Sequence, residues 1–382
     1  MIRVTIPDTL VEYLALLKEV GVPEDNYQNY VNRFFEISSR RKGIPLHGLF
    51  ELTPYCNLDC KMCYVHLNIN QFNPDNLLST HTWIQLINDA YEAGMRTATL
   101  SGGECLTYPG FDDIYIALYQ LQIPTGILTN GVLLNRDRIN FFKEYPPDHI
   151  QVSLYGSNED AYEHVTGMRS FEIVYKNILL AKEAKLPLRI AITPNRFLQN
   201  NLVSLIEFVE KLGIRYSVNA FLTSPRDNTG RKKEDMSIEQ YLTMYRKADE
   251  LRNLDDWTTV DPMELPEYGL GTEKRYGLQC GAGKSGFVIQ YNGNMSPCVA
   301  LYQITATPLK DGFENAWKSI NNAASHYPLP IECGKCDYWS VCTHCPARHS
   351  NAPQEGHCDP EICEHTRQLV IAGFLQLPNN NS

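Results

Sequence analysis

Residues 51–64 read ELTPYCNLDCKMCY and place Cys56, Cys60 and Cys63 in a Cys-x-x-x-Cys-x-x-Cys arrangement, directly after the apolar run 48–52. Three thiolates at this spacing can hold three irons of a four-iron cluster and leave the fourth iron without a protein ligand. An iron with a free position can bind a small molecule and pass an electron to it, whereas a cluster with four cysteine ligands is closed. The stretch therefore predicts a catalytic iron–sulfur centre.

A zinc site is the alternative for the same three cysteines. Structural zinc normally takes four protein ligands, and no fourth cysteine or histidine completes a familiar zinc pattern here. His66 is the nearby residue that offers a further ligand. The spacing therefore favours a cluster over zinc.

Short apolar runs alternate with amphipathic segments from residue 48 to about residue 222. This alternation is typical of repeated βα units around a parallel sheet. The six predicted strands are 49–53, 97–101, 125–129, 150–154, 188–193 and 216–221, and the predicted helices include 82–93, 112–121, 171–184 and 202–212. Gly94 and Gly213 follow two of these helices, where a left-handed residue turns the chain into the next strand. We predict an α/β fold, a partial (β/α)6 barrel of the TIM type, with the cysteines in the loop after the first strand, where such folds carry their chemistry.

The composition is that of a globular protein of 382 residues, with 43% hydrophobic and 20% charged residues. No apolar run is long enough to span a bilayer, and the N-terminus lacks the features of a secretory signal, so we expect a cytoplasmic protein without a membrane partner. The formal net charge of −10 argues against a nucleic-acid partner. In a reducing compartment, the twelve cysteines indicate metal ligands rather than disulfides.

The chain divides into five predicted segments. They are a helical lead-in (1–47), the barrel (48–222), a polar connector (223–270) with one helix near 238–251, a cysteine-rich domain (271–370) and a C-terminal tail (371–382). The cysteine-rich domain shows little regular periodicity. We therefore expect metal ligation, more than a hydrophobic core, to hold it together.

The cysteine stretch resembles that of the radical S-adenosylmethionine (radical SAM) superfamily, whose open iron binds the amino and carboxylate groups of SAM. The residues 101–104, Ser-Gly-Gly-Glu, resemble the family's Gly-Gly-Glu element, and the segment 166–171 resembles a stretch that carries a basic residue. The resemblance implies SAM contacts from Gly102, Gly103, Glu104, Asn130, Ser153, Arg169 and Thr193. Arg169 is the candidate for the SAM carboxylate, because a guanidinium can hold a carboxylate with two hydrogen bonds. Taken alone, the Gly-Gly-Glu element would be a tight turn with a surface glutamate.

Eight further cysteines lie in the cysteine-rich domain, at Cys280, Cys298, Cys333, Cys336, Cys342, Cys345, Cys358 and Cys363. Their order resembles the SPASM domain, which carries two auxiliary four-iron clusters, although two residues rather than the usual three separate Cys342 from Cys345. Eight cysteines suffice for two closed sites of four. The resemblance implies an inner cluster at Cys280, Cys298 and Cys345, and an outer cluster at Cys333, Cys336, Cys342 and Cys358. Cys363 is an addition to the family's seven-cysteine pattern and is then expected as the fourth inner ligand, with an exchange of Cys358 and Cys363 as the alternative.

A zinc ribbon is the alternative for this domain, because two Cys-x-x-Cys pairs separated by five residues can hold zinc. The spare ligands would then be His344, His349, His357 and His365. A zinc ribbon would be structural, whereas auxiliary clusters would form an electron conduit for a reaction in which a substrate radical loses an electron.

The resemblance extends over about residues 48–363 and implies an enzyme, a radical SAM/SPASM maturase of peptides. Such an enzyme cleaves SAM reductively to a 5′-deoxyadenosyl radical and removes hydrogen from a ribosomally made precursor peptide, to form a thioether or carbon–carbon cross-link. The alternatives are a maturase that oxidises a cysteine or serine of a protein, as sulfatase-type maturases do, and a dehydrogenase of a small alcohol. A non-catalytic iron–sulfur electron carrier is the alternative outside the enzymes.

The implied partners are the precursor peptide or protein substrate and a low-potential electron donor of the flavodoxin or ferredoxin type. Many such enzymes hold a leader peptide with an N-terminal winged-helix domain. Residues 1–47 look helical and too short for one. A separate leader-recognition protein is therefore one option.

Three residues are candidates for catalytic roles. Cys105 directly follows Glu104, and some relatives use a thiol as hydrogen donor, although a free cysteine is more often a compact apolar residue. Tyr64 and Asp227 lie near predicted strand ends and are candidates for a proton acceptor. Ordinary loop surface is the simpler interpretation for both.

Overall fold

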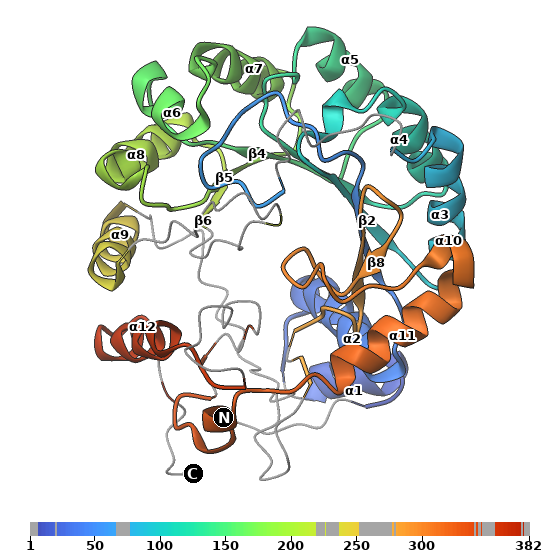
Figure 1. Cartoon of the computed structure of the whole chain (residues 1–382). Helices are drawn as coiled ribbons and strands as arrows, with labels where there is room; N and C mark the ends of the chain where they lie inside the picture. The colour runs from blue at the N-terminus through green and yellow to red at the C-terminus, as the bar shows by residue number, and fades with distance from the viewer. Residues whose placement is uncertain are drawn as a thin grey trace.

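One curved sheet of eight strands organises the fold (Figure 1). The computed structural model describes residues 7–19, 21–65, 77–218, 226, 237–251, 277–278, 280–339, 341–342, 345, 356–375 and 377. The strands are β1 (His47–Glu51), β2 (Thr97–Ser101), β3 (Thr125–Thr129), β4 (His149–Ser153), β5 (Leu188–Ile192), β6 (Tyr216–Val218), β7 (Gly286–Ile289) and β8 (Met295–Ser296). They lie in the order β6-β5-β4-β3-β2-β1-β7-β8, with all pairs parallel except β7 with β8.

The outer face of the sheet is covered by an arc of helices that alternate with the strands in the chain (Figure 1). They are α3 (Thr80–Glu92), α4 (Phe111–Gln120), α5 (Arg136–Glu144), α6 (Glu159–Thr166), α7 (Phe171–Glu183) and α8 (Leu202–Leu212). In α8 the residues Leu202, Leu205, Ile206 and Val209 are buried, at the three- and four-residue spacing of an amphipathic helix. Gly213 ends this helix in the left-handed conformation, as predicted. The predicted partial barrel is therefore confirmed.

The N-terminal segment folds into two helices with a small core of their own, as expected for a helical lead-in. Helices α1 (Leu10–Glu19) and α2 (Tyr27–Lys42) pack through a cluster of buried apolar residues, in which the rings of Tyr13 and Phe34 stack at 5.2 Å. Glu36 of α2 accepts hydrogen bonds from His47 of β1 and from Ser285, so polar contacts anchor the lead-in to the sheet.

The segment 286–325 belongs to the barrel rather than to a separate metal-held domain. Strand β7 pairs in parallel with β1, and Phe287 of β7 packs against Phe50 at 6.0 Å between ring centroids. Helix α11 (Phe313–Ser325) places Phe313, Trp317 and other apolar residues in the main core. The expectation of little regular structure was wrong here, because a four-residue strand gives almost no periodicity and its partner lies far away in sequence.

Within the described ranges, the remaining elements are three α-helices and four short 3-10 helices. They are α9 (Ile238–Leu251), α10 (Pro308–Asp311), α12 (Pro360–Ile371) and the 3-10 helices Glu24–Asn26, Cys105–Thr107, Gln199–Asn201 and Ile331–Lys335. Helix α9 has the bounds predicted for the connector helix. Over the described part of the chain, we find no helix with the length and apolar character needed to cross a membrane.

Candidate active site

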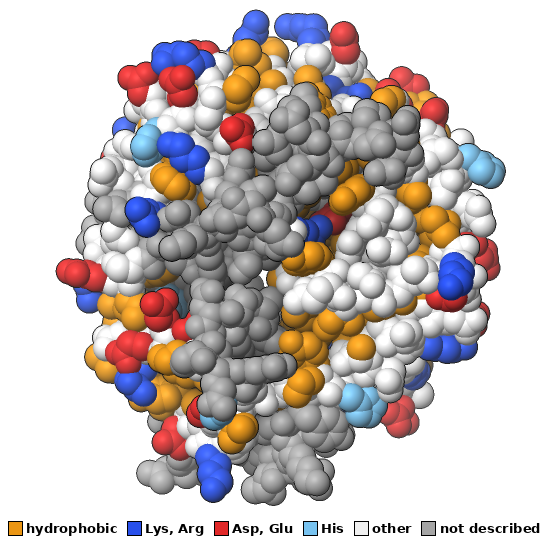
Figure 2. Space-filling view, viewed as in Figure 1, with side chains coloured by type: hydrophobic (Ala, Val, Ile, Leu, Met, Phe, Trp, Pro, Cys, Tyr) orange, Lys and Arg blue, Asp and Glu red, His pale blue; other side chains and the backbone are white. Residues whose placement is uncertain are grey.

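A cavity of about 360 Å³ opens at the carboxyl ends of the parallel strands. This edge is where α/β folds of this kind place their ligands. The predicted residues that line the cavity are Cys56, Cys60, Cys63, Tyr64, Gly102, Gly103, Asn130, Ser153 and Thr193. On the face in Figure 2, charged side chains of both signs are scattered, and hydrophobic side chains gather near the middle, beside the part that is not described. The structure therefore brings most of the predicted site together in one place.

The two glycines after β2 let the cysteine loop approach the sheet closely. The Gly103 N–H donates to the Thr53 carbonyl at 2.7 Å, and the Glu104 N–H donates to the Tyr55 carbonyl at 2.9 Å. A Cβ at Gly103 would lie 2.6 Å from the Pro54 carbonyl oxygen and closer still to that of Tyr55. Only glycine fits here. The close contact fixes the backbone at Tyr55 and so directs Cys56, the next residue, into the cavity.

Helix α6 and Asn130 hold the rest of the cysteine loop. The N–H groups of Asp59 and Lys61 donate to carbonyls at the C-terminal end of α6, at 2.9 and 3.0 Å. The Asn130 side-chain amide donates to Asn57 at 2.7 Å and lies 3.6 Å from the Cys56 Sγ. The loop is therefore tied at several points before any cofactor binds.

Burial keeps Cys56 and Cys60 protonated in the absence of metal. It raises the pKa of Cys56 to about 12, with further contributions from the nearby Glu104 and Cys63, and it raises the pKa of Cys60 well above its usual value. Metal binding must therefore release protons from these thiols. Among the described residues, no three Cys, His, Asp or Glu side chains converge closely enough for a single metal ion.

Glu104 lies behind the cavity wall rather than in it. Its buried carboxylate accepts hydrogen bonds from the Asn130 N–H at 2.7 Å, the Thr129 hydroxyl at 2.9 Å and the Leu106 N–H at 3.1 Å. Burial raises the pKa of Glu104, against these hydrogen bonds, which lower it. The Glu104 carboxylate joins the ends of β2 and β3. This arrangement does not provide the predicted contact with the SAM ammonium group.

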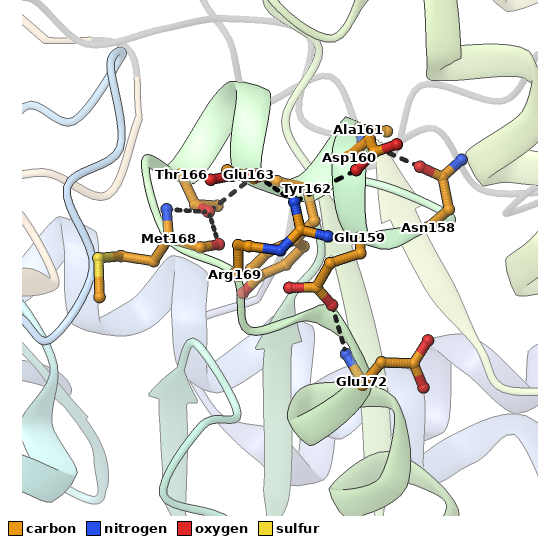
Figure 3. Close-up of polar contacts among 10 residues, drawn as sticks. All are labelled: Asn158, Glu159, Asp160, Ala161, Tyr162, Glu163, Thr166, Met168, Arg169 and Glu172. Atoms are coloured by element: carbon orange, nitrogen blue, oxygen red, sulfur yellow. Dashed lines mark hydrogen bonds and ion pairs between the residues drawn. The ribbon is translucent and has the colours of Figure 1, made fainter.

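The structure does not bring Arg169 to the cavity. As Figure 3 shows, its guanidinium points back along α6, to Glu163 at 2.6 Å and Asp160 at 3.3 Å. The Arg169 side chain is 59% exposed, so these are surface ion pairs. The two acids lie one turn apart on the helix, and their negative charge attracts Arg169 away from the predicted carboxylate site.

Of the two catalytic candidates that the structure describes, Tyr64 lines the cavity and Cys105 does not. Cys105 is fully buried, and its thiol donates to the Leu128 carbonyl at 3.2 Å. It therefore has the compact apolar role given above as the simpler alternative to a hydrogen donor. Burial also raises the pKa of Tyr64, and the nearby Glu51 adds to the rise. Asp227 lies outside the described residues.

Two polar residues that line the cavity were missed in the sequence. Gln151 and Tyr155 flank Ser153 at intervals of two residues along β4 and just beyond it, so the three side chains share one face. The sequence did carry a signal for these two residues. Strands buried on both faces of a parallel sheet are usually apolar throughout, whereas polar residues alternate with buried apolar ones in β4.

The cysteines of the C-terminal region form two sets. In the first, Cys298 is close enough to Cys280 and Cys345 for their charges to raise its pKa, which burial lifts to about 11. In the second, Cys333 is similarly influenced by Cys336, Cys342 and Cys363, and the Sγ atoms of Cys358 and Cys363 lie 2.7 Å apart.

Cys363 therefore lies with the outer set and not, as expected for the one cysteine outside the family's pattern, with the inner one. The inner set contains three cysteines among the described residues, Cys280, Cys298 and Cys345. Two of the histidines considered above as spare zinc ligands are described. The His357 ring forms a hydrogen bond with the Glu332 carboxylate at 2.6 Å, and the buried His365 ring packs against the Tyr241 ring, with 5.2 Å between the ring centroids. His66, His344 and His349 lie outside the described residues.

Residues 50–200 match the model of the Radical SAM superfamily. These residues are therefore similar to radical SAM domains, and the ends of β1 to β5 and the cysteine loop lie within them.

Two curated relatives are similar along most of the chain. The "Antilisterial bacteriocin subtilosin biosynthesis protein AlbA" of Bacillus subtilis (strain 168) is 24% identical over 321 residues, which cover 82% of this chain and 66% of AlbA. The "Sporulation killing factor maturation protein SkfB" of the same organism is 23% identical over 301 residues, which cover 77% of this chain and 68% of SkfB. The chain thus spans about two thirds of the length of each relative.

The solved structure of Streptococcus suis SuiB bound to S-adenosylmethionine has a similar fold. The two chains align with a TM-score of 0.65 and 18% identity, over 93% of this chain and 87% of SuiB. A second structure, of SuiB bound to the precursor peptide SuiA, aligns with a TM-score of 0.64 and 17% identity, over 92% of this chain and 86% of SuiB. The similarity includes the α/β sheet and extends beyond it.

Proposed function

We propose that this chain is a radical SAM/SPASM maturase that cross-links a ribosomally made precursor peptide. The observation that carries the proposal is that Cys56, Cys60 and Cys63 share one cavity with the Gly102–Gly103 turn, at the carboxyl edge of the sheet. The names of AlbA and SkfB, which concern the biosynthesis or maturation of a bacteriocin and of a killing factor, support peptide maturation. The SuiB complex with SuiA supports a precursor peptide as substrate.

The cysteine loop would hold a [4Fe-4S] cluster, and the cavity would hold SAM. When bound and reduced, such a cluster would supply the electron for cleavage of SAM to methionine and a 5′-deoxyadenosyl radical able to take a hydrogen atom from the substrate. The cavity volume of about 360 Å³ lies within the range of small-molecule sites.

The residues around the cavity have two tasks in this proposal. The polar side chains of Asn130, Gln151 and Ser153 would orient SAM by hydrogen bonds. Leu58 and Met62 give the wall an apolar character that excludes water. Tyr64, which is half-buried at the edge of the same cavity, remains the candidate that touches substrate, but its raised pKa keeps the phenol protonated and does not favour a role as proton acceptor.

The C-terminal cysteines would hold two auxiliary iron–sulfur groups. The inner set would be held by Cys280, Cys298 and Cys345, and the outer set by ligands from Cys333, Cys336, Cys342, Cys358 and Cys363. Forming a cross-link removes two hydrogen atoms from the peptide: one goes to the deoxyadenosyl radical, and the other leaves as a proton and an electron. Auxiliary clusters are suitable acceptors for that electron.

Three further partners or conditions belong to the proposal. A low-potential flavodoxin or ferredoxin would reduce the first cluster, and a separate protein would present the leader peptide. A reducing cytoplasm would keep the twelve cysteines available as ligands.

The test starts with anaerobically purified protein reduced in the presence of SAM. We expect about four irons per cluster, formation of 5′-deoxyadenosine, and, with a precursor peptide encoded beside the gene, a product lighter by two hydrogen atoms per cross-link. Zinc in place of the auxiliary iron would contradict the electron-conduit role. Iron-loaded protein that does not cleave SAM would contradict the enzyme and support an electron carrier. A peptide cysteine or serine converted to an aldehyde would support the alternative maturase.

A further inference from the structure

Arg226 contacts three parts of the chain that are far apart in sequence. Its guanidinium forms two hydrogen bonds with the Glu51 carboxylate at the end of β1, at 2.7 and 2.9 Å. The same guanidinium donates to the Val299 carbonyl at 2.6 Å. The Arg226 N–H donates to the Tyr64 carbonyl at 3.0 Å.

Two of these contacts fall directly beside predicted cluster ligands. Tyr64 follows Cys63 of the cavity, and Val299 follows Cys298 of the inner set. Arg226 therefore joins the loop of the SAM site, through its backbone N–H, to the segment of the inner auxiliary site, through its guanidinium.

The arrangement is buried and has a fixed geometry. The Arg226 side chain is 9% exposed and that of Glu51 is 1% exposed. The rings of Tyr64 and Tyr302 lie over the guanidinium, at 5.2 and 5.1 Å from its carbon. A planar group held by a two-pronged carboxylate and two rings has little freedom to rotate.

Stability alone does not explain such a pair well. Removing two charges from water is expensive, and apolar residues of similar size often give equal or greater stability. Buried ion pairs are best attested where they specify one arrangement of the parts that they join. Here those parts are the two cysteine-bearing segments.

We propose that Arg226 is a positioning residue, anchored by Glu51, that fixes the Cys63 loop relative to the Cys298 segment. This inference rests on the proposed function, because it assumes that both segments hold iron–sulfur clusters. It adds that the relative placement of the SAM cluster and the inner auxiliary cluster depends on one arginine. The cation beside Cys298 also favours the reduced, more negative state of the cluster held there.

Arg138 provides a matched control. It also pairs with an acid, Asp112, and its guanidinium carbon lies 4.9 Å from the Phe111 ring and 5.1 Å from the Phe141 ring. Its contacts join α4 to α5 and touch neither cysteine segment. Arg138→Met therefore removes a similar structural contact without affecting the proposed link.

The experiment compares full-length, anaerobically iron-loaded wild type with Arg226→Met, Arg226→Lys, the double variant Glu51→Gln/Arg226→Met, and Arg138→Met. The double variant removes both buried charges and so avoids an unpaired carboxylate that would oppose folding. The readouts are iron per chain, SAM cleavage, the midpoint potential of each cluster, and the spin–spin interaction between the reduced clusters in electron paramagnetic resonance.

We expect Arg226→Met to retain iron, to lose the wild-type spin–spin interaction, and to shift the inner cluster to a more negative potential. The double variant should also lose the spin–spin interaction, but its inner-cluster potential should stay near that of wild type, because it removes one charge of each sign. Arg226→Lys should keep the potential near that of wild type but not the spin–spin interaction, because lysine retains the charge without the two-pronged geometry. Arg138→Met should keep both signals even where it lowers the melting temperature.

Wild-type spin–spin interaction and potential in iron-loaded Arg226→Met would overturn the inference. If Arg226→Met does not fold, the double variant and Arg226→Lys decide by the spin–spin interaction alone: its loss supports the inference and its retention overturns it. The outcomes separate this inference from the proposed function. Wild type without iron or without SAM cleavage would refute both, whereas an active wild type with unchanged variants would refute the inference alone.

Discussion

Replacing Gly103 by alanine tests whether the close contact between the Gly-Gly turn and the cysteine loop shapes the cavity. The new Cβ would lie 2.6 Å from both the Pro54 carbonyl oxygen and the Tyr55 carbonyl carbon. Carbon contacts are favourable at about 3.5–4.0 Å, so the loop would have to retreat by roughly 1 Å. All the obstructing atoms belong to the backbone, so no side-chain rotation can relieve the clash.

The magnitude follows from that displacement. Overpacking of this kind destabilises a fold by about 1–3 kcal/mol. Misplacing a reacting group by 1 Å can lower a rate by about 100-fold. We therefore expect Gly103→Ala to retain its fold and to produce 5′-deoxyadenosine from SAM about 100-fold more slowly than wild type. The assay is a time course of 5′-deoxyadenosine after reduction, normalised to iron content, together with a thermal melt.

Gly286→Ala is the matched control. Gly286 lies on β7 in the same sheet, and the nearest neighbours of its added Cβ lie at 3.6–3.9 Å, which is ordinary contact. It should retain the wild-type rate. If Gly103→Ala cleaves SAM at the wild-type rate with an unchanged melting temperature, then the close contact does not position the cysteine loop, and the account of the glycines is refuted.

Three further predictions concern the metal sites and the fold. Because Cys363 lies with the outer set, Cys363→Ser should reduce iron in the outer cluster and spare the inner one; Mössbauer or resonance spectra that lose the inner cluster instead would contradict this assignment. Burial alone would raise the pKa of Glu36, but hydrogen bonds from His47 and Ser285 lower it from 4.5 to about 2. The stabilising contribution of the Glu36 carboxylate is therefore present above pH 4.5 and lost as the pH falls towards 2. Over that window the melting temperature of wild type should fall more steeply than that of Glu36→Gln. Parallel melting curves would refute a contribution of Glu36 to stability. Glu104→Gln should destabilise the fold by about 1–3 kcal/mol, because an amide cannot accept from all three internal donors, and an unchanged denaturation midpoint would disprove that role.

The barrel was predictable because its strands are short apolar runs at regular intervals. The strands β2 and β3 have the predicted bounds, since both are buried on a parallel sheet and are followed by clear turn residues. Strand β7 was not predictable, because its few residues gain their meaning only from pairing with β1, which lies far away in the chain. Local patterns report on neighbours in sequence, and that contact is not local.

The site was predictable to the level of the loops but not of every side chain. The cysteines and glycines line the cavity because the backbone of a loop at a strand end fixes their position. Arg169 has a long side chain whose direction depends on the charges around it, and Asp160 and Glu163 hold it on the surface. Cys358 lies just before helix α12 and Cys363 lies in its first turn, so the two thiols are neighbours. This local contact places Cys363 with the outer set of cysteines.

The central claim is that Cys56, Cys60 and Cys63 hold a cluster whose open iron faces the SAM cavity. The most direct measurement is the electron paramagnetic resonance spectrum of the reduced protein, recorded before and after SAM is added, in wild type and in Cys60→Ser. The account predicts a cluster signal that changes on addition of SAM in wild type and is absent from Cys60→Ser. A signal that SAM leaves unchanged, or one that persists when Cys60 is replaced, would contradict it.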